Sequence, residues 1–246
     1  MTLHHRIDDA GDRVVVLSGS LGSTLDMWHA QLPALAERFR VLRYDHPGHG
    51  GSPLSDARSI DGLARQVVAL LDELGLERVS FCGLSLGGAV GMRLALDVPQ
   101  RIERLVLCST AARFPNPDLY GERAAAVRAG GVEPAADGVL ERWFTPEFGD
   151  VRRYREMLVS TQAEGYARCC EAVRDWDVRS SLGAVRAPTL AIAGADDPST
   201  PPDHLRAIAD EIPDSRLVVI DGARHLVNVE CADEFNEALL AHLVGR

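Results

Sequence analysis

The pentapeptide Gly83-Leu84-Ser85-Leu86-Gly87 limits what this chain can fold into more than any other feature, because it separates a strand pattern from a helix pattern. Residues 78–84 are rich in β-forming side chains, and residues 88–96 are small and apolar, as in a helix packed closely on a sheet. A glycine two positions before and after the serine removes Cβ atoms that would collide in a sharp strand-to-helix turn. The pattern predicts a strained turn that presents the Ser85 hydroxyl as a nucleophile at a helix N-terminus.

Apolar runs alternate with amphipathic stretches along much of the chain, which predicts an α/β fold with a mostly parallel central sheet flanked by helices. The expected strands are residues 14–17, 41–44, 78–84, 105–108, 189–193 and 217–220. Apolar residues recur at helical spacing over 60–74, and further helices are expected at 88–96 and 232–243.

Between residues 112 and 182 this rhythm changes to aromatic-rich helical segments joined by proline and glycine turns. The stretch is far longer than a usual connection, which rarely exceeds about 15 residues. We therefore expect a helical cap at 112–182, inserted into a core formed by residues 1–111 and 183–246.

A serine hydroxyl is a weak nucleophile and needs a base. His225 is the best-placed histidine, since it follows the last expected strand and precedes the closing helix, which brings it to the carboxyl edge of the sheet. The acid should follow the preceding strand, where Asp196 and Asp197 both stand. We favour Asp197 as the partner that fixes the tautomer of His225, which gives a predicted catalytic triad of Ser85, Asp197 and His225.

The tetrahedral intermediate of such a reaction needs two backbone N–H donors. Leu86, which directly follows the nucleophile, is expected to supply one. The second should come from the glycine-bounded loop 19–22 after the first core strand, where Ser20 is our choice and Leu21 remains the alternative.

The composition excludes several classes of function. With 36 acidic residues against 26 basic ones, the formal net charge is −10, so nucleic acid and anionic membranes are poor partners. The chain contains no lysine, which removes a lysine base, a Schiff base and a P-loop lysine. No apolar run approaches the roughly 18 residues of a membrane span, and residues 1–9 lack the apolar core of a secretory signal. We therefore expect a cytoplasmic protein with no membrane contact.

The cysteines predict neither a disulfide framework nor a zinc site, because their number is odd and no CxxC pair occurs. Buried small apolar side chains explain them better. They are Cys82, Cys108, Cys169, Cys170 and Cys231. We expect no metal and no organic cofactor, and the sequence leaves open whether the chain forms a homo-oligomer.

These motifs and their surroundings resemble the 3-oxoadipate enol-lactonases of the α/β-hydrolase superfamily over nearly the whole chain. Segments shared with the wider superfamily are Ser20-Leu21-Gly22, Arg43-Tyr44-Asp45-His46, Gly48-His49-Gly50-Gly51-Ser52 and the serine turn. More specific matches are residues 109–113, 126–131, 140–145, 169–175, 192–194 and 200–202. The resemblance implies an α/β-hydrolase fold and puts the acid at Asp197.

The resemblance also implies a reaction, the opening of the 3-oxoadipate enol-lactone ring through an acyl-enzyme on Ser85. This small lactone carries a carboxylate, which the net charge of the protein repels, so a local cation should face the pocket. Arginine suits this role because its guanidinium binds a carboxylate through two hydrogen bonds. The expected candidates are the cap residues Arg113, Arg128 and Arg142, with Trp143 in the pocket wall.

Two rival functions remain open at this point. One is a different hydrolase on the same scaffold, such as another esterase or lactonase, or a hydrolase of carbon–carbon bonds. The other is a ligand-binding protein without catalysis, although such a protein would more often have lost a member of the triad.

Overall fold

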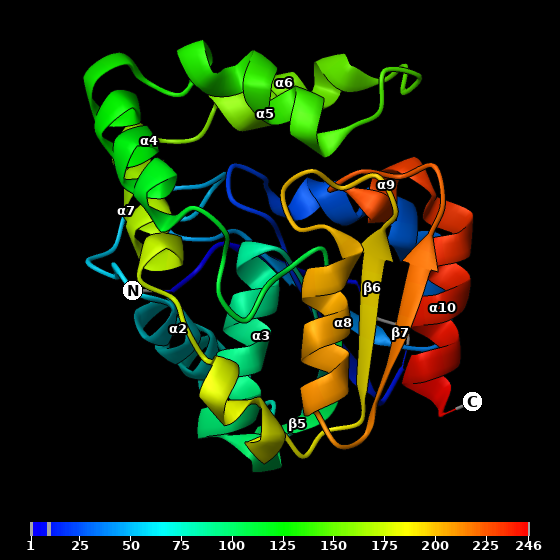
Figure 1. Ribbon diagram of the computed structural model, residues 1–246. Helices are drawn as coiled ribbons and strands as arrows, with labels where there is room; N and C mark the ends of the chain where they lie inside the picture. Colours follow the sequence, from blue (N-terminus) through cyan, green and yellow to red (C-terminus); the bar gives the residue numbers. More distant parts are fainter. Residues whose placement is uncertain (1, 9–10, 246) are drawn as a thin grey trace.

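A seven-stranded sheet runs through the centre of the computed structural model, which describes residues 2–8 and 11–245 (Figure 1). The spatial order is β1-β3-β2-β4-β5-β6-β7, with β1 antiparallel to β3 and every other neighbouring pair parallel. The strands are β1 His5–Asp8, β2 Val14–Ser18, β3 Arg40–Tyr44, β4 Val79–Leu84, β5 Ile102–Cys108, β6 Thr189–Gly194 and β7 Ser215–Ile220.

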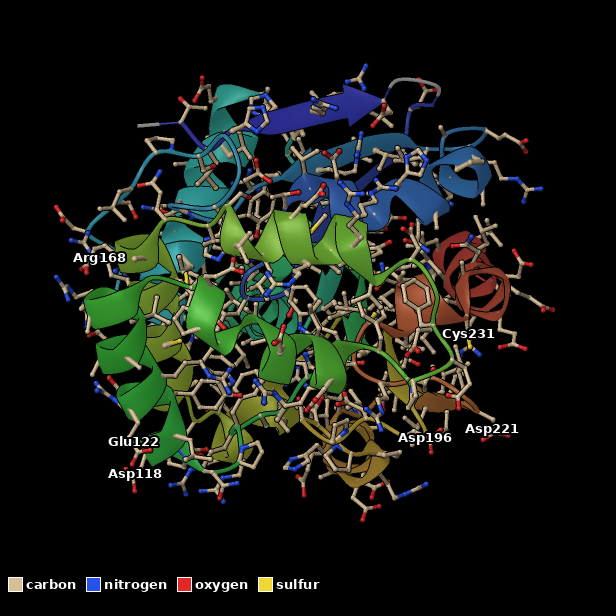
Figure 2. The ribbon with its side chains drawn as sticks, turned by 90° about the horizontal axis from the view of Figure 1, so that it is seen from above. Asp118, Glu122, Arg168, Asp196, Asp221 and Cys231 are labelled. Atoms are coloured by element: carbon tan, nitrogen blue, oxygen red, sulfur yellow. The ribbon has the colours of Figure 1, made fainter. Side chains whose placement is uncertain are left out.

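Helices cover both faces of this sheet. Helices α2, α3 and α8 lie on one face, while α10 packs on the other with the short α1 (Figures 1 and 2). The core helices are α1 Leu32–Leu35, α2 Ile60–Glu73, α3 Leu86–Asp97, α8 Pro202–Glu211, α9 Val227–Glu230 and α10 Ala232–Val244. Short 3-10 helices lie at Leu25–Gln31, Pro99–Arg101, Glu133–Ala135 and Arg179–Ala184. The expected α/β-hydrolase fold, with a mostly parallel sheet between helices, is confirmed.

The inner strands form where the sequence is continuously apolar, because strands covered on both faces need no polar side. Every residue of β2, β4 and β6 is buried. Strand β1 was not among the expected strands, and its side chains are exposed or half-buried. This edge strand pairs with β3 through its backbone, so no apolar run marks it.

Four helices are inserted between β5 and β6. They are α4 Pro117–Gly130, α5 Ala136–Trp143, α6 Val151–Val159 and α7 Ala163–Arg174. Figure 1 shows α5 and α6 above the carboxyl ends of the strands, with α4 and α7 packed side by side at one end. The helical insertion was expected. That residues 112–182 form a cap distinct from the core remains a prediction. Within the described ranges, no helix combines the length and apolar character needed to span a bilayer.

Candidate active site

Ser85 occupies the turn between β4 and α3 in a strained backbone conformation, with φ 56° and ψ −110°. Its N–H donates to the Cys108 carbonyl at 2.9 Å, and its own carbonyl accepts from Thr110 Oγ1 at 2.8 Å. The flanking glycines are required by close packing. A Cβ on Gly83 would collide with the Gly87 carbonyl, and one on Gly87 would lie 2.6 Å from Ser18 Oγ. The serine thus stands on the strained turn that the pentapeptide predicts.

The loops after β6 and β7 bring a carboxylate and an imidazole together. Asp197 Oδ2 lies 2.8 Å from His225 Nδ1, and both residues are buried. The same oxygen accepts from Thr200 Oγ1 at 2.7 Å, while Oδ1 accepts from the N–H groups of Ser199 at 2.8 Å and Thr200 at 3.2 Å. Asp196, the alternative, is exposed (Figure 2).

These bonds keep Asp197 ionised. Burial alone would raise its pKa, but attraction to His225 and the hydrogen bonds from His225, Thr200 and Ser199 outweigh burial and leave the pKa below its usual value. An ionised carboxylate on Nδ1 holds the proton there and leaves Nε2 of His225 free to act as a base.

One pocket is lined by Ser85, by His225 and by residues of the inserted helices. The core contributes Ser20, Leu21, Ser85, Ser199 and His225 to its lining. The insertion contributes Phe114, Tyr120, Arg123, Val139, Arg142, Trp143, Tyr166 and Val173. The free space is about 30 Å³, far below the roughly 300 Å³ of a small-molecule site, so a ligand can enter only if the covering helices or their side chains shift.

Ser20 and Leu21, the two candidates for the second oxyanion donor, line this pocket, and Leu86 directly follows Ser85. Leu86 is the first residue of α3, so its N–H belongs to the unpaired donors of a helix N-terminus. The Ser20 N–H donates to Met27 Sδ at 3.4 Å, and sulfur is a weak acceptor that an oxyanion can replace. Leu21 lines the same pocket, so the second donor stays a choice between these two neighbours.

Two buried histidines hold this loop in place. His46 Nε2 contacts the Gly19 carbonyl at 3.1 Å, and His49 Nε2 accepts from the Gly22 N–H at 3.0 Å. Burial lowers the pKa of His46 to about 3 and that of His49 to about 4. Both rings are therefore neutral at pH 7, and neither serves the predicted triad.

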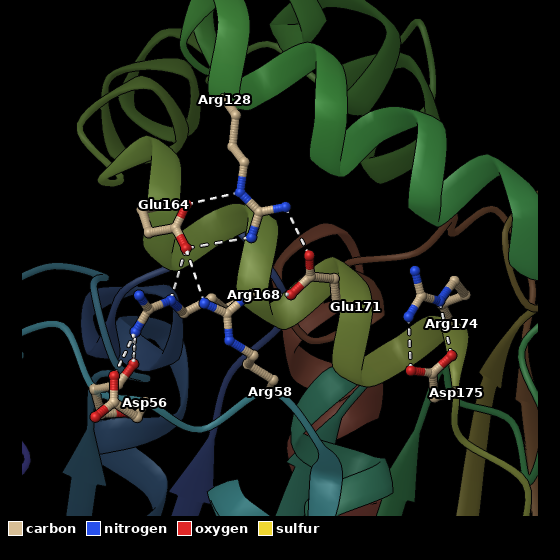
Figure 3. Close-up of polar contacts among 9 residues, drawn as sticks. Asp56, Arg58, Arg128, Glu164, Arg168, Glu171, Arg174 and Asp175 are labelled. Carbon is tan, nitrogen blue, oxygen red and sulfur yellow. Dashed lines mark hydrogen bonds and ion pairs between the residues drawn. The ribbon is translucent and has the colours of Figure 1, made fainter.

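The predicted substrate-binding residues divide into two groups. Arg142 and Trp143 line the pocket. Arg128 is instead outside the pocket lining, and it binds Glu164 at 2.7 Å and Glu171 at 2.6 Å (Figure 3). Arg113 is exposed and pairs with Asp177 at 4.0 Å. The structure thus places two of the three predicted arginines outside the pocket, because carboxylates on the insertion surface bind them.

Arg123 is the pocket cation that the sequence analysis missed. Its guanidinium carbon lies 5.3 Å from the centre of the Tyr120 ring. Burial lowers the pKa of Arg142, and repulsion by Arg123 lowers it further, so the two charges are close enough to interact. Across the described ranges, no carboxylate oxygen comes within 4.0 Å of either guanidinium. The pocket therefore carries two positive charges with no carboxylate of the described residues at ion-pair distance.

A family model described as the alpha/beta hydrolase fold matches residues 12–231. The chain belongs to the α/β-hydrolase family. This α/β hydrolase is 38% identical over 234 residues to 3-oxoadipate enol-lactonase 2 of Acinetobacter baylyi, covering 92% of this chain and 87% of that relative.

Solved structures agree with this relationship. The crystal structure of the enol-lactonase from Burkholderia xenovorans LB400 has a TM-score of 0.95 and 39% identity, covering 98% of this chain and 96% of that one.

A sequence relative with a different provisional name is the carbamate hydrolase RutD of Stutzerimonas stutzeri, which is 34% identical, covering 98% of this chain and 95% of that relative. The α/β hydrolase is thus related to the 3-oxoadipate enol-lactonases, as the sequence resemblance implied, within a family that has more than one substrate.

Proposed function

We propose that this α/β hydrolase opens the ester of 3-oxoadipate enol-lactone to give 3-oxoadipate, through an acyl-enzyme on Ser85. The proposal rests on one observation above all. The pocket that contains Ser85 and His225 also contains Arg123 and Arg142, two guanidinium groups without a protein carboxylate. A substrate with an ester at one end and a carboxylate at the other matches this distribution of groups.

In the first half of the reaction, His225 Nε2 removes the proton of Ser85 as Oγ attacks the lactone carbonyl. The resulting oxyanion is held by the N–H of Leu86 and by that of Ser20 or Leu21, each worth roughly 3 kcal/mol in the transition state. Collapse breaks the ring carbon–oxygen bond and expels an enolate, which becomes a ketone on protonation. In the second half, His225 activates a water that cleaves the acyl-enzyme and frees the acid.

The test is hydrolysis of the purified enol-lactone, followed by the loss of its ultraviolet absorbance. We expect kcat/KM of at least about 10⁴ M⁻¹s⁻¹. Ser85→Ala should lower kcat by about 10⁴-fold or more, because the nucleophile is lost. A panel of comparison substrates contains the methyl ester of the lactone, a neutral aryl ester and an alkyl carbamate. If a neutral ester or the carbamate has a higher kcat/KM than the lactone, the proposed substrate is wrong and the protein is a different hydrolase on this scaffold.

A further inference from the structure

The C-terminal end of α5 meets the loop that carries His225. The last four carbonyls of a helix have no partner inside it and must find one elsewhere. In α5, the last carbonyl that is bonded locally is that of Leu140, which accepts from the Phe144 N–H at 3.0 Å. The four carbonyls that follow are those of Glu141, Arg142, Trp143 and Phe144.

Three consecutive residues of the histidine loop bind all four of these carbonyls. The Arg224 guanidinium donates to those of Glu141 and Phe144. The His225 N–H donates to the Arg142 carbonyl at 3.4 Å, and the Leu226 N–H donates to the Trp143 carbonyl at 3.1 Å. Segment 224–226 is therefore the C-terminal cap of a helix more than 80 positions earlier in the chain. Figure 1 shows the top of β7 and α9 directly below α5 and α6.

The Glu230 carboxylate forms a second connection between the histidine loop and the residue that follows the end of α5. Glu230 Oε1 accepts from the Thr145 N–H at 2.6 Å and from Thr145 Oγ1 at 2.7 Å. Its other oxygen, Oε2, accepts from the Arg224 N–H at 2.6 Å. Hydrogen bonds to an ionised group are stronger than neutral ones, and Glu230 is half-buried, so this bridge is held firmly.

We propose that Glu230 is a positioning residue, which fixes the loop of His225 to the end of α5 and thereby couples the substrate-facing helix to the general base. The residue whose carbonyl receives the His225 N–H is Arg142, and its side chain lines the pocket. Entry of a ligand requires movement of the covering helices or side chains, and movement at α5 is transmitted to His225 through these bonds. The role of Arg142 rests on the proposed function, whereas the effect of Glu230 on His225 does not.

The test compares Glu230→Ala and Glu230→Gln with Glu147→Ala. Glu147 is exposed two positions beyond Thr145 and has no interaction with the described residues, so it serves as the matched control. A neutral aryl ester reports on Ser85 and His225 without using the guanidinium pair. We expect Glu230→Ala to lower kcat for this ester by about ten- to a hundredfold through misplacement of the base, with KM within about threefold of the parent value.

Glu230→Gln is close to the same size and keeps one acceptor oxygen, so it should fold normally and lose less activity than Glu230→Ala. Circular dichroism checks the fold of each variant, and the rate of Ser85 labelling by a fluorophosphonate should fall in parallel with kcat.

Folded Glu230 variants with parental kcat and labelling rate would overturn the proposal. Losses confined to KM, or equal to those of Glu147→Ala, would do the same. Because the ester and the labelling probe do not depend on the lactone, failure of the proposed substrate and failure of this coupling are distinguishable.

Discussion

At the scale of single residues, the two guanidinium groups above Ser85 are the most informative feature of the site. An unpaired charge is costly to hold away from water, and a pair of like charges costs more. Arg123 and Arg142 lie half-buried beside tyrosine and cysteine side chains, and the attraction of Arg142 to Glu141 acts from beyond ion-pair distance. An anionic ligand would supply the charge that the pocket lacks.

We therefore expect Arg142→Ala and Arg123→Ala each to raise KM for the enol-lactone by about ten- to a hundredfold, since a hydrogen bond to a charged group is worth about 1.5–3 kcal/mol. KM for the methyl ester of the lactone should change far less. Arg128→Ala provides the control, because Arg128 binds Glu164 and Glu171 on the outer surface and should leave both KM values within about twofold. Equal effects of all three variants on both substrates would contradict an anion-binding role.

The adjacent aspartates Asp196 and Asp197 offer a second comparison at this scale. Asn is nearly isosteric with Asp but cannot hold the Nδ1–H tautomer of His225 in the same way. Asp197→Asn should lower kcat for a neutral ester by about 10³- to 10⁴-fold, whereas Asp196→Asn, at an exposed position, should stay within about twofold. Steady-state kinetics with active-site titration measures both. Comparable losses of kcat in the two variants would show that catalysis does not depend on the Asp197–His225 contact.

At the scale of helices and strands, the sequence predicted most of what the backbone does. Buried central strands appear as unbroken apolar runs, and the serine turn requires its glycines for steric reasons, so both are local signals. The choice of Arg128 in place of Arg123 failed because it ignored which face of α4 each residue occupies. Arg123 lies among the positions 120, 124 and 127 that face inward, while Arg128 is one step beyond and faces the carboxylates of α7. The capping of α5 by residues 224–226 joins distant parts of the chain, and no sequence pattern reports it.

Replacement of glycine by alanine should have opposite effects on stability in α3, which follows the serine turn, and in α4. A Cβ at Gly87, near the start of α3, would collide with the Ser18 carbonyl and lie 2.6 Å from its hydroxyl. A Cβ at Gly121, inside α4, would meet nothing closer than Arg174 Cδ at 3.6 Å. We expect Gly87→Ala to lower the free energy of unfolding by about 2 kcal/mol or more, and Gly121→Ala to raise it by about 0.5–1 kcal/mol. Denaturant titration measures both, and a stable Gly87→Ala variant would contradict the packing argument.

At the scale of the whole molecule, buried neutral histidines make the stability depend on pH in a predictable direction. Burial lowers the pKa of His46 to about 3, and of His49 and His242 each to about 4, against an ordinary value of 6.5. The unfolded chain therefore binds more protons than the folded one between about pH 6.5 and pH 4. Their contribution to stability is fully present above pH 6.5 and is lost as the pH falls.

Each of these histidines should lower the free energy of unfolding by about 1.4 kcal/mol for every pH unit below 6.5, until its folded pKa is reached. Glu164, whose bonds to Arg128 and Arg168 lower its pKa to about 2, titrates below this window, so the range from pH 6 to pH 5 is the one in which the buried histidines are compared. His49→Gln can still accept a hydrogen bond from the Gly22 N–H, yet it cannot take up a proton. Denaturant titrations at several pH values should therefore show a slope that is shallower by about 1.4 kcal/mol per pH unit in His49→Gln than in the parent. A parental slope in that variant would mean that His49 is not a buried neutral base that accepts from the Gly22 N–H.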